Sequence, residues 1–182
     1  MTDAQFDAAI GLIVRGDKSG LKEIYNAYAR QICQVITGIV KNPQDAEDLT
    51  ADLFMKLWET ASQYRPGSGH KRYITVMARN LALDFLRRNN RLSFELDDEE
   101  QNTVVADTQD VQKDIEEKIG FWAALDSLNP NQRQIVDMHI AMQMTLKEIS
   151  EAMKMPMGTV AWNYRTAIER LRNLYREDEV YG

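Results

Sequence analysis

Basic side chains are concentrated between residues 65 and 91, and those at 72, 79, 87 and 91 share the solvent face of a predicted helix, a pattern suited to binding nucleic-acid phosphates. Only one acidic residue, Asp84, lies among them. The apolar positions 74, 77, 81 and 85 fall on the opposite face of the helical wheel. The basic residues of this stretch are Arg65, Lys71, Arg72, Arg79, Arg87, Arg88 and Arg91. The alternative at this point is an ordinary solvated charged face.

A second basic helix follows near the end of the sequence, and a short turn separates it from the helix before it. Residues 146–153 carry an apolar stripe, and residues 154–157 form the turn. This is the spacing of a helix-turn-helix, whose second helix lays its first residues in the DNA major groove, where Asn pairs with adenine and Arg with guanine. A plain helical hairpin is the alternative. The predicted groove-facing residues are Thr159, Trp162, Asn163, Arg165 and Thr166, with Arg170 and Arg172 nearer the DNA backbone.

Helices must position nearly all of these residues, because apolar residues recur every three or four positions and Pro and Gly are scarce. Residues 16–20 separate two N-terminal helices, a third helix is predicted over about 44–64, and a fourth over about 71–91. Asn129 and Thr145 are predicted caps of two later helices. The predicted buried stripe of the second helix is Leu21, Ile24, Tyr25, Tyr28, Ile32, Val35, Ile36 and Ile39.

The composition changes over residues 93–110, which contain seven acidic residues and no Lys or Arg. Such a segment is typical of a flexible acidic linker. The predicted fold is therefore all-α, with two small helical domains over residues 1–92 and 111–182. The 182-residue chain has a formal net charge of −6. Attraction to phosphate reaches only ~8 Å at physiological salt, so local basic patches decide binding and the total charge does not.

Several function classes are excluded by the composition. Residues 1–14 lack the basic region and cleavage site of a signal peptide, and no apolar run approaches the ~18 residues of a membrane span. We therefore expect a cytoplasmic protein. Cys33 has no partner for an internal disulfide, and His70 and His139 lack zinc spacing, so neither a metal nor a cofactor is expected. No catalytic constellation or phosphate loop is present, which argues against an enzyme.

Taken in order, these segments resemble the extracytoplasmic-function group of bacterial sigma factors, which carry the second and fourth conserved sigma regions. "DAEDLTADLFMKLWE", residues 45–59, is similar to the polymerase-binding segment, and "YITVMARNLALDFLRRNNR", residues 73–91, to the helix that melts the promoter and reads its minus-ten element. "LNPNQRQIV", residues 128–136, and "TLKEISEAMKMPMGTV", residues 145–160, resemble the minus-thirty-five module. Gly16 and Asp17 match an early Gly-Asp pair of the family.

The resemblance implies a region 2 helical bundle and a region 4 helix-turn-helix that bind core RNA polymerase and duplex and single-stranded promoter DNA. An anti-sigma factor is the implied regulatory partner. Tyr73 and Asn80 join the basic residues as implied DNA contacts, and the loop 67–70 as a pocket for an unstacked base. His70 by itself is expected to be an exposed loop histidine. The implied polymerase-binding residues are Asp45, Asp48, Leu49, Asp52, Phe54 and Trp58.

The sequence departs from the family pattern in its reading helix. After Gly-Thr-Val the family commonly has Lys-Ser-Arg, whereas this chain has Ala161, Trp162 and Asn163, so two customary cations are absent. Tyr73 stands where the family usually has Trp, and His70 where it has an aromatic residue. Two alternatives stay open: a sigma mimic that titrates an anti-sigma factor, and a generic helix-turn-helix regulator.

Overall fold

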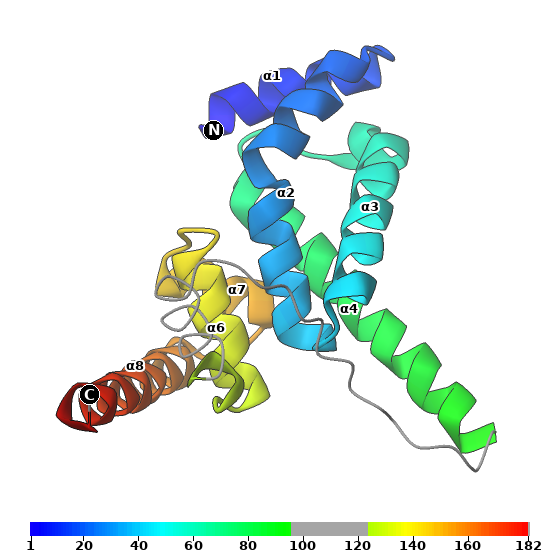
Figure 1. The fold of residues 1–182 in the computed structure, drawn as a ribbon. Coiled ribbons are helices and arrows are strands. Elements are labelled where there is room, and N and C mark those ends of the chain that lie inside the picture. The colour runs from blue at the N-terminus through cyan, green and yellow to red at the C-terminus, as the bar shows by residue number, and fades with distance from the viewer. Residues whose placement is uncertain (96–123, 182) are drawn as a thin grey trace.

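The computed structural model describes the backbone of residues 1–95 and 124–181 and the side chains of residues 1–89 and 124–174. Within these residues every regular element is a helix, which confirms the predicted all-α class. The elements are α1 (Asp3–Val14), α2 (Lys18–Val40), α3 (Pro43–Thr60), the 3-10 helix η1 (Ala61–Gln63), α4 (His70–Glu95), α6 (Pro130–Ile140), α7 (Leu146–Met153) and α8 (Met157–Tyr181) (Figure 1).

The expected linker lies mostly outside the described residues. Residues 93–95 continue α4, and the rest of the segment 93–110 falls outside, as do residues 111–123 of the predicted second domain.

Helix starts follow the capping chemistry of the sequence. The Thr145 side chain accepts a hydrogen bond from the backbone N–H of Glu148, whose carboxylate accepts one in return from the Thr145 N–H at 2.7 Å. Asn129 and Gln132 form the same reciprocal box at the start of α6, with Pro130 as its first helical residue. These boxes satisfy N–H groups that the first helical turn leaves without partners. The predicted caps at Asn129 and Thr145 are confirmed.

The first half is a bundle in which α2 contacts α1, α3 and α4 (Figure 1). Gly20 lies within α2 rather than between helices, at a point where α1 approaches closely. A Cβ added there would lie 2.2 Å from the Ala9 carbonyl oxygen. Tyr25 was predicted in the buried stripe of α2, but it is 51% exposed, with its ring against Phe54 at a centroid distance of 4.8 Å. It sits on the margin of the stripe, and α3 covers only one side of it.

The second half packs directly onto the first. α6 lies against α2 and α7 lies against α4, and Figure 1 shows the far end of α4 extending away from both halves. One apolar cluster contains residues of both halves, among them Ile36 and Leu53 from the first and Ile135 and Met138 from the second. A smaller cluster around Leu125 and Leu171 belongs to the second half alone.

Candidate nucleic-acid interface

The long helix α4 carries the basic face that the sequence predicts. Ile74, Ala78 and Ala82 are fully buried against the bundle. Asn80, Arg87 and Arg88 are exposed. The side chain of Arg91, another predicted DNA contact, lies outside the described residues.

The cations of α4 divide into two groups along the helix. Arg87 and Arg88 near its far end are exposed, and Arg87 pairs with Asp84 at 2.8 Å one turn earlier. The cations nearer its start contact the second half: Arg79 Nε donates to Gln134 Oε1 at 2.9 Å, and Arg72 forms an ion pair with Glu151. Burial, followed by repulsion from Arg87, lowers the pKa of the Arg79 guanidinium.

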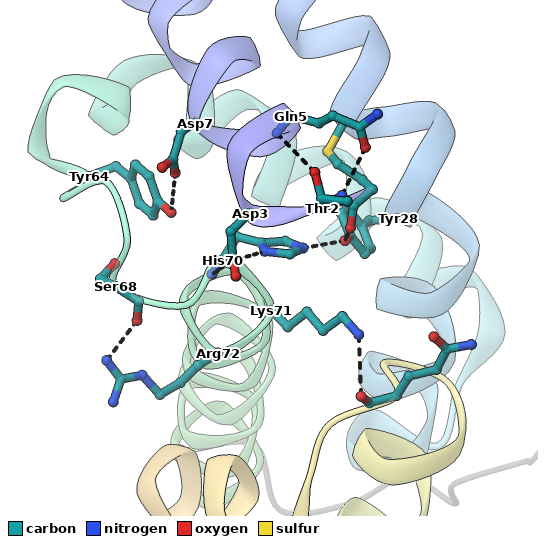
Figure 2. Close-up of polar contacts among 12 residues, drawn as sticks. Thr2, Asp3, Gln5, Asp7, Tyr28, Tyr64, Ser68, His70, Lys71 and Arg72 are labelled. Carbon is teal, nitrogen blue, oxygen red and sulfur yellow. Dashed lines mark hydrogen bonds and ion pairs between the residues drawn. The ribbon is translucent and has the colours of Figure 1, made fainter.

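The Lys71 ammonium belongs to the group that contacts the second half. Its Nζ donates to the Gln143 carbonyl at 3.3 Å (Figure 2). Arg72 also donates to the carbonyl of Ser68 at 2.9 Å, which ties the helix to the loop before it. The loop side of the basic face is therefore held in place by backbone acceptors.

His70 begins α4 and is buried, with 3% of its surface exposed, so the expectation of an exposed loop histidine is wrong. Figure 2 shows its ring between Asp3 and Tyr28. Its Nδ1 donates to the Asp3 carboxylate, and its Nε2 hydrogen-bonds the Tyr28 hydroxyl. The ring also stacks on Phe6 at a centroid distance of 5.0 Å. His70 thus joins the start of α4 to α1 and α2, and its ring faces the core rather than a base pocket.

Hydrogen bonding lowers one pKa at this junction and burial raises another. The side-chain hydrogen bond from His70 lowers the pKa of Asp3 below its ordinary 3.8, and the His70 backbone N–H, which donates at 3.2 Å, lowers it further. Burial raises the pKa of Tyr28 to about 12. Tyr28 therefore stays a neutral hydroxyl at physiological pH.

Tyr73, the predicted stacking ring, lies half-buried next to the loop 65–69. Its ring meets that of Tyr64 edge to face, with centroids 4.9 Å apart. The Tyr64 hydroxyl donates to Asp7 Oδ1 at 2.8 Å, and burial raises the pKa of Tyr64. Tyr73 is only partly buried, so part of the residue remains exposed to solvent.

The predicted polymerase-binding segment forms α3, and its residues divide between surface and core. Asp48 and Asp52 are exposed, Asp45 is half-exposed in the first turn, and Trp58 is partly buried against the core. Leu49 and Phe54 are only 6% and 5% exposed, so their side chains support this face instead of forming it. Their positions in the apolar stripe of α3 account for this burial.

The predicted reading helix α8 presents most of the expected residues to solvent. Thr159, Arg165 and Arg170 are exposed, Thr166 is half-exposed, and Trp162 is 60% exposed. Asn163 is the exception, because it is 6% exposed and its side-chain amide donates to the Thr159 carbonyl at 2.9 Å. It points into the helix-turn-helix core, so the predicted adenine contact is not available from this side chain.

A buried ion pair at the junction of the halves was not found by sequence reasoning. Arg133 Nε donates to Asp137 Oδ2 at 2.7 Å one turn along α6, and both side chains are 1% exposed. Gln34 of α2 donates to the other oxygen of Asp137 at 3.3 Å. Burial raises the pKa of Asp137, while Arg133 opposes the rise. The signal in the sequence was Gly38, an isolated glycine within a helical pattern that marks a close approach.

Two protein-family models match the chain, one in each of its helical halves. The family model for Sigma-70 region 2 matches residues 24–92, and the model for Sigma-70, region 4 matches residues 124–173. The chain is 28% identical over 180 residues to the ECF RNA polymerase sigma factor SigE of Mycolicibacterium smegmatis, covering 96% of this chain and 66% of that protein, just under two thirds of its length. It is 22% identical to SigX of Bacillus subtilis, covering 85% and 84%.

Two solved structures share the fold. CnrH in complex with the cytosolic domain of CnrY superposes with a TM-score of 0.67 at 14% identity, covering 96% of this chain and 99% of that one. The sigma factor RpoE of Bartonella quintana in complex with the anti-sigma factor NepR gives a TM-score of 0.70 at 20% identity, covering 85% and 96%. No helix among the described residues is long and apolar enough to cross a bilayer. With region 2 and region 4 both matched in order, the chain belongs to the sigma-70 family of transcription initiation factors, in its extracytoplasmic-function group.

Proposed function

We propose that this chain binds core RNA polymerase in the cytoplasm and directs it to promoters. The observation that carries the proposal is the order of the two matched segments. Each segment has exposed side chains of the kind that binding to polymerase or DNA requires. Region 2 contributes the acidic face of α3 and the cations of α4, and region 4 contributes the exposed side of α8. The protein performs no chemistry itself and supplies binding and orientation.

The acidic face of α3 is the surface that docks on the polymerase. Asp48 and Asp52 are exposed one turn apart, and Asp45 precedes them by one turn. A basic patch on the polymerase would be steered to such a face and held in one orientation. Met55, which is 62% exposed on the same helix, adds an apolar contact beside the carboxylates.

The cations of α4 bind the strand that is separated during promoter opening. Arg87 and Asp84 pair at 2.8 Å while both are largely exposed, and such surface pairs contribute only about 0–1 kcal/mol. Phosphate oxygens can therefore replace the carboxylate of Asp84 with little loss. Tyr73, beside the loop 65–69, offers a ring on which one base can stack.

The exposed side of α8 reads the upstream duplex. Arg165 is the one predicted base-reading cation in the first turns of this helix, and it is exposed. Thr159 and Trp162 lie on the same side of the helix. The Thr159 methyl group and the Trp162 ring can make apolar contacts with the methyl group of a thymine.

An anti-sigma factor is the proposed regulator. Two structures that share the fold are complexes, one of CnrH with the cytosolic domain of CnrY and one of RpoE with the anti-sigma factor NepR. The exposed apolar side chains Tyr25, Met55 and Trp162 supply contact area for a protein partner, because aromatic residues and Met are enriched at interfaces.

Run-off transcription tests the proposal. Core polymerase is incubated with a library of promoter fragments, with and without this protein, and the transcripts are sequenced. We expect new transcripts that begin at defined positions and share upstream sequence elements. A sigma mimic would yield none while still binding an anti-sigma factor, and a generic helix-turn-helix regulator would fail to co-purify with core polymerase; either result would refute the proposal.

A further inference from the structure

Helix α1 contacts the residues at both ends of the loop 65–69, which leads from η1 into α4 (Figure 2). On the entry side, the Tyr64 hydroxyl donates to Asp7 Oδ1 at 2.8 Å. On the exit side, the backbone N–H of His70 donates to Asp3 Oδ1 at 3.2 Å, and the His70 ring bonds to the same carboxylate. One helix thus fixes both the residue before the loop and the residue after it.

Three residues of α1 make these contacts from one face of the helix. Asp3 lies three positions from Phe6 and four from Asp7, so the three side chains are neighbours on the helix surface. Phe6 is fully buried, with its ring edge to face with Tyr64 at a centroid distance of 5.3 Å and stacked on His70 at 5.0 Å. The ring therefore sets the separation of the two ends of the loop, and the carboxylates set their orientation.

Two glycines make the shape of the loop depend on what holds its ends. Gly67 and Gly69 adopt left-handed backbone conformations with φ angles of 74° and 83°, and Gly loses more conformational freedom on ordering than any other residue. Inside the loop, the Ser68 N–H donates to the Arg65 carbonyl at 3.2 Å. A loop whose ends are already fixed has less freedom to lose when it binds a ligand, and its affinity is higher for that reason.

The entry side of the loop is also linked to the proposed stacking residue. Tyr64 meets Tyr73 edge to face at a centroid distance of 4.9 Å, so the ring that Asp7 holds packs against the ring on which a base can stack. A change at Asp7 is therefore transmitted to the loop and to Tyr73 together. The match to Sigma-70 region 2 covers residues 24–92 and so does not include α1.

We propose that α1 is a positioning element for base capture: Asp3 and Asp7 hold the loop 65–69 in the shape that receives one unstacked base of the separated DNA strand beside Tyr73. The inference rests on the proposed function, because it takes the loop and Tyr73 as part of the strand-binding surface. Asp3 and Asp7 are positioning residues, since they act on the loop through its two flanking residues. Removing either contact should weaken capture of that base and leave the other contacts with the strand unchanged.

An abasic scan of the strand measures base capture position by position. Run-off transcription supplies a promoter that core polymerase uses together with this protein, and fluorescein-labelled single strands of its non-template minus-ten sequence are made with one base removed at a time. Fluorescence anisotropy gives the affinity of the holoenzyme, formed from core polymerase and this protein, for each strand. We expect wild type to lose affinity at the position whose base enters the loop, and this loss is the capture penalty.

Asp7→Ala and Tyr64→Phe break the same hydrogen bond from its two sides. Each should reduce the capture penalty by about twofold to tenfold, the range expected for one hydrogen bond. The double variant should be no worse than either single one, because the two residues share the interaction. Asp3→Ala, which releases the other end of the loop, should reduce the same penalty.

Two further variants separate positioning from charge and from stability. Asp7→Asn keeps an oxygen that accepts from Tyr64, so it should retain the capture penalty. Glu23→Ala, on the exposed side of α2, is the control for loss of a carboxylate elsewhere. The strands that lack a base at other positions serve as an internal control, because a destabilised bundle would weaken binding to all strands alike.

The outcomes distinguish this inference from the proposed function. An unchanged capture penalty in Asp7→Ala and Asp3→Ala would overturn the role of α1, and so would a uniform loss of affinity for every strand. A penalty reduced as much in Asp7→Asn as in Asp7→Ala would contradict hydrogen bonding as the cause. If wild type shows no position-specific penalty, α1 has no captured base to position, while the run-off transcripts still support the proposed function. Absence of transcripts would refute the proposed function, and this inference with it.

Discussion

At the scale of single residues, His70 shows how one side chain can set the start of a functional helix. Its imidazole bonds to Asp3 of α1 and Tyr28 of α2 and stacks on Phe6. This junction fixes the start of α4. It therefore also fixes the position of the loop before His70 and of the half-buried ring of Tyr73, three residues later. A buried residue, His70, thus helps to position residues of the candidate nucleic-acid interface.

Asp3→Asn should make the free energy of unfolding depend less on pH in the acidic range. The pKa of Asp3 is lowered in the folded protein, chiefly by the hydrogen bond from His70. Its charged form therefore stabilises the fold above its ordinary pKa of 3.8, and this contribution is lost as the pH falls through the lowered value. Because Asp3 is largely exposed, we expect a difference under about 1 kcal/mol.

The measurement for Asp3→Asn is urea unfolding between about pH 3 and pH 7. The variant should lose less free energy of unfolding on acidification than wild type, and Glu23→Gln on the exposed side of α2 is the control. Parallel curves for wild type and Asp3→Asn would show that the Asp3 charge does not stabilise the junction.

Arg87→Ala combined with Arg88→Ala should weaken promoter opening and reduce its salt dependence. Each phosphate contact to a single strand contributes about −0.7 to the slope of log affinity against log salt, so two lost contacts should reduce the slope by about 1.4. Lys18→Ala with Lys22→Ala, an exposed pair on α2, makes the same charge change elsewhere. An unaltered slope in the arginine variant would contradict phosphate binding there.

Arg165→Ala should relax discrimination at one upstream base pair, by about 1–3 kcal/mol if the guanidinium contacts a base edge through two hydrogen bonds. Competition binding of the holoenzyme to a promoter and its single-base variants measures this. Arg172→Ala, further along α8 and also exposed, should weaken all sequences equally. Uniform loss in the Arg165 variant would reassign Arg165 to the DNA backbone.

Residue types and spacing predicted the surfaces better than the individual contacts. The capped starts at Asn129 and Thr145 could be read directly, because capping is a local interaction over three residues. Asn163 was misassigned because a polar side chain within a helical pattern is expected in solvent, and His70 was misassigned because a histidine in a predicted loop is expected there too. The partners of His70 lie 42 and 67 residues away in the sequence.

At the scale of elements, α3 separates support from contact along one helix. Leu49 and Phe54 point into the bundle, and Asp48 and Asp52 point away from it. The helical period accounts for this division. The segment that resembles the family's polymerase-binding segment contains both kinds of residue, and their positions on or off the apolar stripe distinguish them.

Reversing Asp45 and Asp48 to Lys should abolish co-purification with core polymerase, because the substitutions replace attraction to a basic patch with repulsion. Neither side chain is buried, so the fold should persist. The control reverses two exposed acidic residues on other helices, Glu23 of α2 and Glu169 of α8, with the same change in net charge. Retained co-purification of the α3 variant would remove α3 from the docking surface.

At the scale of the whole molecule, the two halves meet through an apolar cluster that they share, with a buried ion pair on α6 and exposed ion pairs at the rim. Arg72 pairs with Glu151, and Lys41 pairs with Asp126 at 3.3 Å, and all four side chains are more than a third exposed. Water and salt screen such pairs. The apolar cluster that both halves share, together with the close packing at Gly38, must therefore contribute most of what holds the halves together.

Glu151→Gln should leave the contact between the two halves largely intact. The substitution removes one charge from an exposed pair while keeping a hydrogen-bond acceptor for Arg72, so the free energy of unfolding should change by less than about 1 kcal/mol. Urea unfolding measures the effect. A larger loss of unfolding free energy would show that this exposed pair, and not the shared apolar cluster alone, holds the halves together.

The packing of one half on the other lay beyond sequence reasoning for a physical reason. Gln34 and Asp137, which meet at this contact, are 103 positions apart, and neither helical period nor composition relates residues across such a separation. The polar residues of α6 have the pattern of a solvent face, yet Arg133, Gln134 and Asp137 are buried where the two halves meet. A polar pattern on a helix therefore gave no sign of this contact.

The bare backbone at Gly38 also has a genetic consequence. Every glycine codon becomes an alanine codon by one base substitution, so one point mutation is enough to place a methyl group where α6 crosses α2, 2.2 Å from Asp137 Oδ2. A screen for variants in which α6 packs less tightly on α2 should return this allele, without any change in the exposed residues of α3 and α8.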